Sequence, residues 1–544
     1  MIGAVTEKNA ALFPEEFARR YRAAGYWNED TLATWLPQAA AAHPDAPALV
    51  GHDLAGQEVR WTYAELLAAV RSTAAALAEH GIGRDDFVLV QLPNVVEYFR
   101  VVFAVFYLGA RPVFALPAHR GAELTHFLRE TQAAALVTTQ ARGGVDFPAI
   151  AAEVIASLGA DTQLIVCGED ALEEDPRGVD KPAEVDPESL AFLQVSGGTT
   201  GIPKLIPRAH ADYLYSVRES NRICHITQDT RMLVVLPVSH NFTMSSPGIL
   251  GVIGAGGCCV LTEDPTPTSV FRLIDAEKIT YTCAVPPLAM MWLQMRPRID
   301  ATLDTLEELG VGGAKFTPEA AARVRPVLGC RLRQVFGMAE GLVNYTRNED
   351  PDELVVGTQG RPISPDDEIL ILDDEGNPVP DSERGNLFTR GPYTIRGYFH
   401  GADPGSFTPD GFYRTGDIVR QLPSGHLVVE GRDKDQINRG GEKISAEEIE
   451  NHLIAHPAVI DAALVAVPDD YLGERSCAYV ISAETPTAAD LRDFLRERGV
   501  ATYKIPDRFE FADSFPLTGV GKISRKALRR KLAALLTDTE TQGE

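Results

Sequence analysis

Short continuous apolar runs alternate with longer stretches of helical spacing along much of the chain. A helical stripe follows the capping box Thr62–Glu65 and consists of Leu66, Val70, Ala74 and Leu77. Gly81 ends this stripe, and residues 87–92 then form an apolar run typical of a strand buried on both faces. The pattern next predicts a helix over 95–108 and a strand over 112–116.

The same rhythm continues for about two hundred residues more. It predicts a helix over 121–131 and strands over 135–138, 163–167, 190–195, 232–236, 258–261, 279–285 and 333–335. Strands that alternate with helices form mainly parallel sheets with helices over both faces. We therefore expect an α/β fold with a large N-terminal domain of helix-covered, mainly parallel sheets.

The texture changes twice in the rest of the chain. From about Gly357 to Gly431, short strands separated by Asp/Gly/Pro turns predict a β-rich subdomain. A polar stretch over 432–443 follows, and a helix capped by Ser445 then opens a small α+β unit. A chain of 544 residues is too long to fold around a single hydrophobic core. We therefore predict an N-terminal domain over 1–433 and a mobile C-terminal domain over 434–544, hinged at Lys434. The stretch 169–187 is interpreted as a surface connection.

Composition narrows the choice of partners. The formal net charge of −25 argues against nucleic acids and anionic membranes as main partners. The seven cysteines include no Cys-x-x-Cys pair, which is typical of reduced thiols, and the N-terminus shows no export signal. The longest apolar run, 101–108, is too short to span a membrane. We therefore expect a cytoplasmic protein with no nucleic acid and no membrane partner.

The stretch 193–204 has the chemistry of a phosphate-binding loop. Glycines let backbone amides converge on an anion, hydroxyls add donors, and a lysine neutralises charge. The residues concerned are Ser196, Gly197, Gly198, Thr199, Thr200 and Lys204. The spacing departs from the usual P-loop, and Pro203 argues against an immediate helix start. A plain glycine-threonine turn is the structural alternative.

Further clusters carry charged residues after strands or on glycine-rich loops. Glu340 ends the stretch 335–340, Asp417 ends 413–417, and Lys522 ends the loop 517–522. Each has a structural alternative when taken alone: a helix N-terminal carboxylate, a turn residue and a solvated lysine, respectively. The fourth cluster is the polar stretch 432–443 with its Gly-Gly-Glu-Lys sequence.

Taken together and in this order, these stretches resemble the adenylate-forming superfamily of acyl-CoA synthetases, luciferases and nonribosomal-peptide adenylation domains. The resemblance spans nearly the whole chain. It is closest to stand-alone aryl acid adenylating enzymes, the group that includes the 2,3-dihydroxybenzoate–AMP ligases of siderophore pathways. The closer match is carried by 240–248, 312–315, 335–344 and 440–443.

The resemblance implies ATP and Mg²⁺ as cofactors and assigns residues to them. The phosphates would be held by the loop from Ser196 to Lys204, and the adenine would lie against Gly313, Ala314, Val335 and Phe336, with Gly337 beside them. Asp417 would bind the ribose with Arg432 nearby, and Glu340 would bind Mg²⁺. Lys522 would be the catalytic lysine of adenylation, and Lys443 would serve the thioester-forming conformation.

The resemblance also implies an aryl acid pocket. Its residues would be His240, Asn241, Phe242, Ser246, Gly313, Val343 and Lys522. His240 would approach the carboxylate, Asn241 a phenolic hydroxyl and Ser246 a second hydroxyl. Phe242 departs from the tyrosine expected at that position, and salicylate-selective relatives tend to carry cysteine where Ser246 stands. The structural alternative for His240-Asn241 is a helix-entry turn after Pro237.

We therefore expect ATP-dependent conversion of an aryl acid, 2,3-dihydroxybenzoate first, to aryl-AMP with release of pyrophosphate. The acyl group would pass to the phosphopantetheine thiol of an aryl carrier protein in siderophore biosynthesis. The alternatives are a ligase for salicylate or another substituted benzoate, an aryl-CoA ligase that uses free CoA, and a non-catalytic nucleotide-binding module. The last would be favoured if Lys522 or Glu340 were missing.

Overall fold

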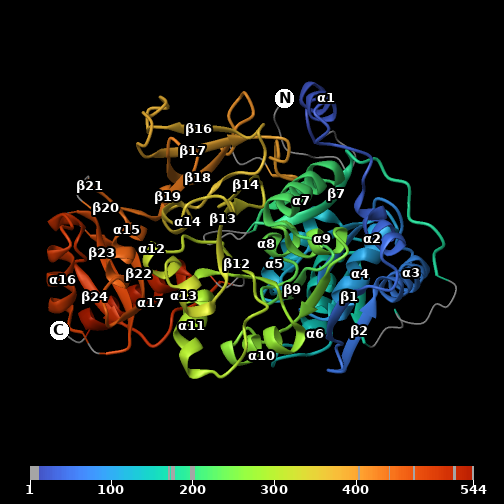
Figure 1. Ribbon diagram of the computed structural model, residues 1–544, viewed down its shortest axis with the longest axis horizontal. Coiled ribbons are helices and arrows are strands. Elements are labelled where there is room, and N and C mark those ends of the chain that lie inside the picture. The colour runs from blue at the N-terminus through green and yellow to red at the C-terminus, as the bar shows by residue number, and fades with distance from the viewer. Residues whose placement is uncertain are drawn as a thin grey trace.

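The computed structural model describes residues 12–168, 172, 178–196, 203–401, 405–439, 442–469, 472–484, 486–518 and 522–541. Figure 1 shows the first two sheets and their helices in blue through green to golden yellow. A β-rich layer in orange lies beside them, and the C-terminal elements in orange to red form one end of the molecule. The expected α/β class with a β-rich part and a small C-terminal unit is therefore confirmed.

The first sheet has the strand order β6-β5-β3-β4-β7-β8. Its strands are β3 (Phe87–Gln91), β4 (Arg111–Phe114), β5 (Ala135–Thr139), β6 (Gln163–Cys167), β7 (Leu190–Val195) and β8 (Leu205–Ala209). All neighbours are parallel except β7 and β8, which form an antiparallel hairpin. Every residue of β3, β4, β5 and β7 is buried, which explains their continuous apolar runs.

The second sheet has the order β15-β14-β13-β12-β11-β9-β10-β1-β2. Its strands are β1 (Pro47–His52), β2 (Glu58–Thr62), β9 (Arg231–Val234), β10 (Cys258–Leu261), β11 (Tyr281–Ala284), β12 (Glu308–Gly312), β13 (Arg331–Met338), β14 (Gly341–Tyr345) and β15 (Arg361–Pro362). The strands from β1 to β13 along this order are parallel, and antiparallel strands close both edges.

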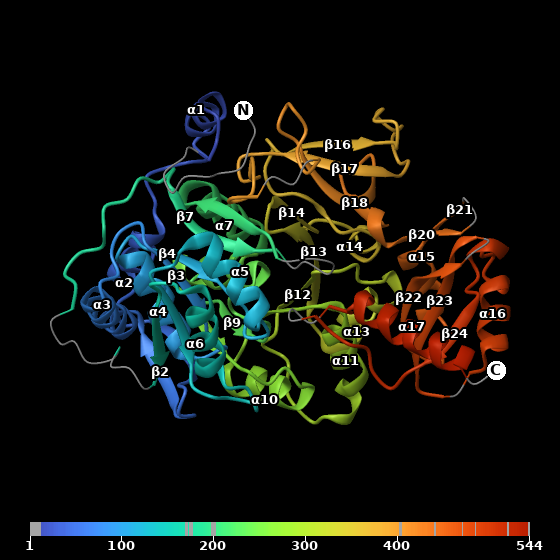
Figure 2. The ribbon, with the colours of Figure 1, turned by 180° about the vertical axis from the view of Figure 1, so that it is seen from behind.

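Helices separate and cover these sheets. Every residue of α4 (Val96–Tyr107) is buried, because this helix packs on β4 of the first sheet and on β1 of the second. The predicted capping box at Thr62 begins α3 (Tyr63–Glu79), whose stripe is buried as expected. In Figure 2, α5 (Gly121–Thr131) and α6 (Phe147–Leu158) lie on the outer face of the first sheet.

The remaining helices of this part lie before, between and after the strands of the two sheets along the chain. They are α1 (Glu15–Ala23), α2 (Leu32–Ala42), α7 (His210–Cys224), α8 (Asn241–Ser245), α9 (Gly248–Gly254), α10 (Pro267–Glu277), α11 (Pro286–Met295), α12 (Pro318–Ala321), α13 (Val324–Leu328) and α14 (Asp352–Gly357). A short 3₁₀ turn, η1 (Arg296–Arg298), follows α11. In the described part of the chain, every helix is too short or too polar to cross a membrane.

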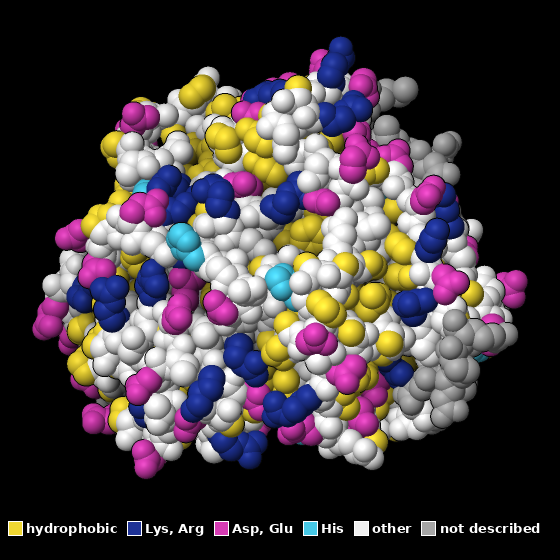
Figure 3. Space-filling model, turned by 45° about the vertical axis from the view of Figure 1, so that its right-hand side comes forward, with side chains coloured by type: hydrophobic (Ala, Val, Ile, Leu, Met, Phe, Trp, Pro, Cys, Tyr) yellow, Lys and Arg dark blue, Asp and Glu magenta, His cyan; other side chains and the backbone are white. Residues whose placement is uncertain are grey.

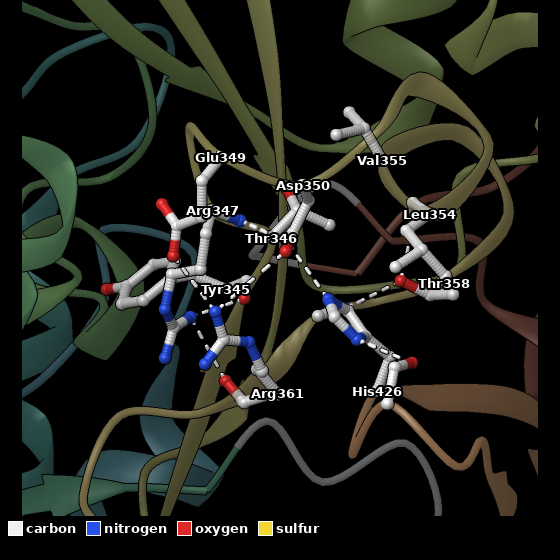
Figure 4. A network of polar contacts seen from close by, with 12 residues as sticks. Tyr345, Thr346, Arg347, Glu349, Asp350, Leu354, Val355, Thr358, Arg361 and His426 are labelled. Atoms are coloured by element: carbon white, nitrogen blue, oxygen red, sulfur yellow. Dashed lines mark hydrogen bonds and ion pairs between the residues drawn. The ribbon is translucent and has the colours of Figure 1, made fainter.

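The β-rich layer is an antiparallel sheet of β16 (Glu368–Leu372), β17 (Gly385–Arg390), β18 (Tyr413–Gln421) and β19 (Leu427–Arg432). A polar network joins it to the second sheet (Figure 4). The ring Nε2 of buried His426, in the β18–β19 turn, lies 2.9 Å from Asp350 Oδ2. The same carboxylate oxygen accepts a hydrogen bond of 2.6 Å from the backbone N–H of Arg347. Asp350 therefore fixes the β-rich layer to the loop that follows β14.

The C-terminal elements have their own sheet and apolar clusters. The strands are β20 (Gln436–Arg439), β21 (Glu442–Ser445), β22 (Val459–Asp469), β23 (Gly473–Ser482) and β24 (Arg508–Phe511). The helices are α15 (Ala446–Ile454), α16 (Ala488–Glu497) and α17 (Arg525–Thr541), with 3₁₀ turns η2 (Asp433–Asp435) and η3 (Thr502–Lys504). The Ser445 hydroxyl caps α15 as predicted, by accepting the Glu448 N–H at 3.4 Å.

The surface mixes charges of both signs. On the face that Figure 3 shows, basic and acidic side chains are interspersed among the described residues.

Candidate active site

The predicted adenine-site residues meet where two neighbouring parallel strands end. Gly312 at the end of β12 is in register with Val335 in β13, so the segments that follow lie side by side. Gly313 has a φ of +88°, a left-handed conformation that favours glycine. A β-carbon there would lie 3.3 Å from both Lys522 Cε and Val285 Cγ1. Glycine thus lets the backbone approach Lys522, which reaches this edge from the C-terminal unit.

His240 lies close enough to Lys522 for the two to affect each other's charge. Burial lowers the pKa of His240 to about 3, and the positive charge of Lys522 adds to the effect. The imidazole is therefore neutral near pH 7. Its Nδ1 accepts a hydrogen bond of 3.3 Å from the Phe242 N–H, so the ring proton resides on Nε2. His240 is thus an uncharged donor at the site.

His240 also begins a helix. It is the N-cap residue of α8, so the helix-entry interpretation from the sequence describes its backbone correctly and is compatible with a role in the site. Asn241, the first residue of α8, is half-buried. Its Oδ1 accepts a hydrogen bond of 2.8 Å from the hydroxyl of Tyr213 in α7.

The other predicted pocket residues are buried around the same place. A β-carbon on Gly312 would lie 3.2 Å from the tip of the Phe242 ring, so that glycine makes room for the ring. Val343 in β14 lies against Gly337 across the β13–β14 pair. Ser246 is buried, and its hydroxyl hydrogen-bonds the Tyr345 phenol, whose pKa is raised mainly by burial.

Glu340, in the turn between β13 and β14, belongs to a network of aromatic hydroxyls. Its Oε1 accepts a hydrogen bond of 2.9 Å from the Tyr398 hydroxyl, which lies 3.1 Å from the Tyr413 hydroxyl. The ammonium of Lys204 stands 4.5 Å from the centre of the Tyr398 ring, a cation–π contact. Tyr398 therefore joins the end of the predicted phosphate loop to the predicted metal ligand.

Asp417 and Arg432 face each other across an antiparallel pair. They are directly opposite in β18 and β19, and Arg432 Nε lies 2.8 Å from Asp417 Oδ1. The other carboxylate oxygen, Oδ2, is buried and has no hydrogen-bond partner among the described residues. A buried acceptor without a partner is costly unless a ligand satisfies it, and a ribose hydroxyl would do so.

The predicted phosphate loop is described only at its ends. The N–H of Ser196 donates to the Lys204 carbonyl at 3.0 Å, and the Lys204 N–H donates to the Ser196 hydroxyl at 2.9 Å. The loop thus closes the β7–β8 hairpin. The predicted residues Gly197, Gly198, Thr199 and Thr200 lie outside the described residues. So do the side chains of Lys434 and Lys443. The roles assigned to all of these remain predictions.

The side chains near Glu340 suit a magnesium ion that is shared with a nucleotide better than a metal ion whose ligands all come from the protein. In the described ranges, His, Cys, Asp and Glu residues form no cluster of three or more that could hold a metal ion. Mg²⁺ is usually held by one or two carboxylates together with the phosphates of a nucleotide. The single buried carboxylate of Glu340, beside the end of the phosphate loop, fits that pattern.

Several residues that shape the site were not predicted from the sequence. Buried Arg208 in β8 donates to the carbonyl of Ala339 at 2.8 Å and to that of Tyr393 at 3.1 Å. It thereby anchors the turn that presents Glu340. Tyr398 and Tyr213 likewise act through Glu340 and Asn241. Their sequence neighbourhoods have no feature that would have indicated these contacts.

The chain is similar to known proteins over nearly its whole length. The family model described as AMP-binding enzyme matches residues 36–399, and the one described as AMP-binding enzyme C-terminal domain matches 448–522. A "2,3-dihydroxybenzoate-AMP ligase" of Bacillus subtilis is 51% identical over 96% of this chain and 98% of its own. A "Vibriobactin-specific 2,3-dihydroxybenzoate-AMP ligase" of Vibrio cholerae is 47% identical over 96% and 98%. The apo structure of MbtA from Mycobacterium smegmatis is 45% identical, covers 95% of this chain and 98% of its own, and has a TM-score of 0.73.

Proposed function

The chain belongs to the AMP-binding enzyme family, and we propose that it uses ATP to activate an aryl acid, preferably 2,3-dihydroxybenzoate, as the aryl-AMP. The observation that carries this proposal is the meeting of Lys522, neutral His240 and Gly313 at the ends of β12 and β13. The presence of Lys522 and Glu340 disfavours the non-catalytic nucleotide-binding module.

In the first step, a carboxylate oxygen of the acid attacks the α-phosphorus of ATP. An O–P bond forms, and the bond to pyrophosphate breaks with its electron pair. Two anions approach each other, so a fixed positive charge at this place lowers the barrier. Lys522 supplies that charge. His240 donates from Nε2 to the acid without adding charge, because its imidazole is neutral.

The rest of the nucleotide site follows from the same geometry. The adenine would lie between Gly313–Ala314 and Val335–Phe336, and the buried Oδ2 of Asp417 would accept from the ribose. Glu340 would hold Mg²⁺, which supplies charge neutralisation on the phosphates when bound. Ser196 and Lys204 bracket the loop proposed for the phosphates.

In the second step, the aryl-AMP reacts with the phosphopantetheine thiol of an aryl carrier protein. The sulfur attacks the carbonyl carbon, a thioester forms and AMP leaves. We propose that the C-terminal domain turns about Lys434 so that Lys443 replaces Lys522 at the site.

The names of the Bacillus and Vibrio relatives support dihydroxybenzoate as the acid, and the Vibrio name supports a siderophore pathway. Free CoA is the alternative acceptor. We keep a cytoplasmic location as part of the proposal, which the buried free thiols of all seven cysteines support.

ATP–pyrophosphate exchange across a panel of substituted benzoates tests this function. We expect 2,3-dihydroxybenzoate to support the fastest exchange and salicylate to support slower exchange. Exchange with long-chain fatty acids but with no benzoate would refute aryl acid activation. Comparing CoA with holo-carrier protein as thiol acceptor then decides the second step.

A further inference from the structure

Tyr213 has a hydroxyl placed to control the orientation of the Asn241 amide. The ring is 1% exposed and packs edge-on against Phe192, with centroids 4.7 Å apart. The guanidinium carbon of Arg208 lies over the Tyr213 ring, 4.7 Å from the ring centroid. A ring held on these sides keeps its hydroxyl in one place. That hydroxyl is 2.8 Å from Asn241 Oδ1 and donates to it.

An amide has one acceptor end and one donor end. Because Tyr213 donates to Oδ1, the Nδ2 end of Asn241 points away from Tyr213. Asn241 is half-buried at the start of α8, next to His240, whose pKa the charge of Lys522 helps to lower. If His240 meets the carboxylate of the acid, the group that Asn241 reaches is the ring substituent beside that carboxylate.

The two common ortho substituents differ in what they present outward. In a 2-hydroxybenzoate, the single hydroxyl proton is donated to the neighbouring carboxylate, which leaves an oxygen lone pair facing outward. In a 2-aminobenzoate, one N–H is donated to the carboxylate and the second N–H faces outward. The Nδ2 donor can therefore form a hydrogen bond with the hydroxyl oxygen of a 2-hydroxybenzoate. With a 2-aminobenzoate it would meet a second N–H donor, which disfavours binding.

We infer that Tyr213 is a positioning residue that holds Nδ2 of Asn241 toward the acid and thereby selects 2-hydroxybenzoates over 2-aminobenzoates. This inference rests on the proposed function. It adds a buried phenol, outside the acid pocket, that decides hydroxyl against amine. The bond from Tyr213 is the one hydrogen bond to the Asn241 amide found among the described residues, so without the phenol the amide can offer its oxygen to an outward N–H.

The test is Tyr213→Phe, which keeps the ring and removes the hydroxyl. Exchange would be measured with salicylate and with 2-aminobenzoate, and the ratio of their kcat/KM values compared with that of the wild type. We expect this ratio to fall about tenfold, within the range of about tenfold to a hundredfold for a mismatched buried hydrogen bond. A general loss of packing would lower both values together and leave the ratio unchanged.

Tyr98→Phe is the matched control. Tyr98 is also fully buried and also contacts α8, where its hydroxyl lies 3.4 Å from Met244 Sδ, and its hydroxyl is not a hydrogen-bond partner of Asn241 among the described residues. Its loss should leave the ratio at the wild-type value. On an Asn241→Ala background, Tyr213→Phe should have no further effect on the ratio.

A second variant covers the case in which Tyr213→Phe does not fold. Asn241→Asp replaces the donor with an acceptor, and it should lower the salicylate to 2-aminobenzoate ratio by at least as much. An unchanged ratio in a folded Tyr213→Phe, or in Asn241→Asp, would overturn the inference while aryl acid activation stood. A wild-type enzyme that exchanges with no benzoate would overturn the proposed function itself.

Discussion

Replacing Lys522 by alanine removes the charge on which the proposed chemistry depends. The lysine is held against Gly313, where an added β-carbon would be 3.3 Å from Cε. Its charge is already felt by His240, whose pKa it lowers in addition to burial. Loss of one preorganised donor or charge of this kind raises an activation barrier by ~3 kcal/mol, a factor of about one hundred in rate. We therefore expect Lys522→Ala to reduce kcat for pyrophosphate exchange about a hundredfold or more.

The assay is ATP–pyrophosphate exchange with saturating acid, compared with thermal unfolding of the same variants. Lys526→Ala, at an exposed lysine of α17, is the matched control and should exchange at the wild-type rate. Lys443→Ala should spare exchange and slow thioester formation. The His240 pKa, followed by NMR, should rise in Lys522→Ala because a repelling charge is gone. Near-normal exchange by Lys522→Ala would refute its catalytic role, and equal damage by Lys443→Ala would refute the separation of the two steps.

Other predictions follow from neighbouring contacts. Tyr398→Phe removes a hydrogen bond of ~1.5–3 kcal/mol to the Glu340 carboxylate, so the Mg²⁺ concentration for half-maximal exchange should rise about tenfold. Ser246→Cys should narrow the preference for 2,3-dihydroxybenzoate over salicylate, seen as the ratio of kcat/KM values, because a thiol is a weak partner for the 3-hydroxyl. Burial raises the pKa of Glu447 to about 7 beside Gly431. Protonated Glu447 is therefore the form favoured in this arrangement of the C-terminal unit. The stability of this arrangement should fall as the pH rises from the usual carboxyl range through about 7. Glu447→Gln should flatten that dependence in exchange assays.

The fold was predictable where burial left a local pattern. The run over 87–92 is apolar because β3 is buried on both faces, and the stripe of α3 is apolar because only one face meets the core. The strand β8 was not predicted. It contains Pro207 and Arg208, and the latter is buried only because distant carbonyls and Asp212 surround its guanidinium. The carbonyls that accept from Arg208 lie 131 and 185 residues further along the chain, and no local pattern encodes such distant partners.

The site divides in the same way. Gly313 and Glu340 could be predicted because each has a property that shows in its local sequence. Gly313 permits a close backbone approach, and Glu340 offers a carboxylate directly after a strand. Tyr398 is separated from Glu340 by 58 residues and Tyr213 from Asn241 by 28. Each acts only by orienting another side chain. Tertiary structure brings these pairs together, so the sequence indicated the groups that we propose to face the ligand and missed the residues that hold them.

The position of Lys522 on a separate unit has a consequence for His240. Burial is the larger cause of its low pKa, and Lys522 adds to it. If the C-terminal domain withdraws Lys522 after adenylation, the imidazole stays buried and therefore stays neutral. The Phe242 N–H still holds Nδ1 as an acceptor, so the Nε2 proton remains available. His240 would thus offer the same uncharged donor to the carboxylate in the first step and to the acyl oxygen in the second. The fixed charge would be present only while two anions must be brought together, and the thiol would then approach an aryl-AMP that keeps its orientation.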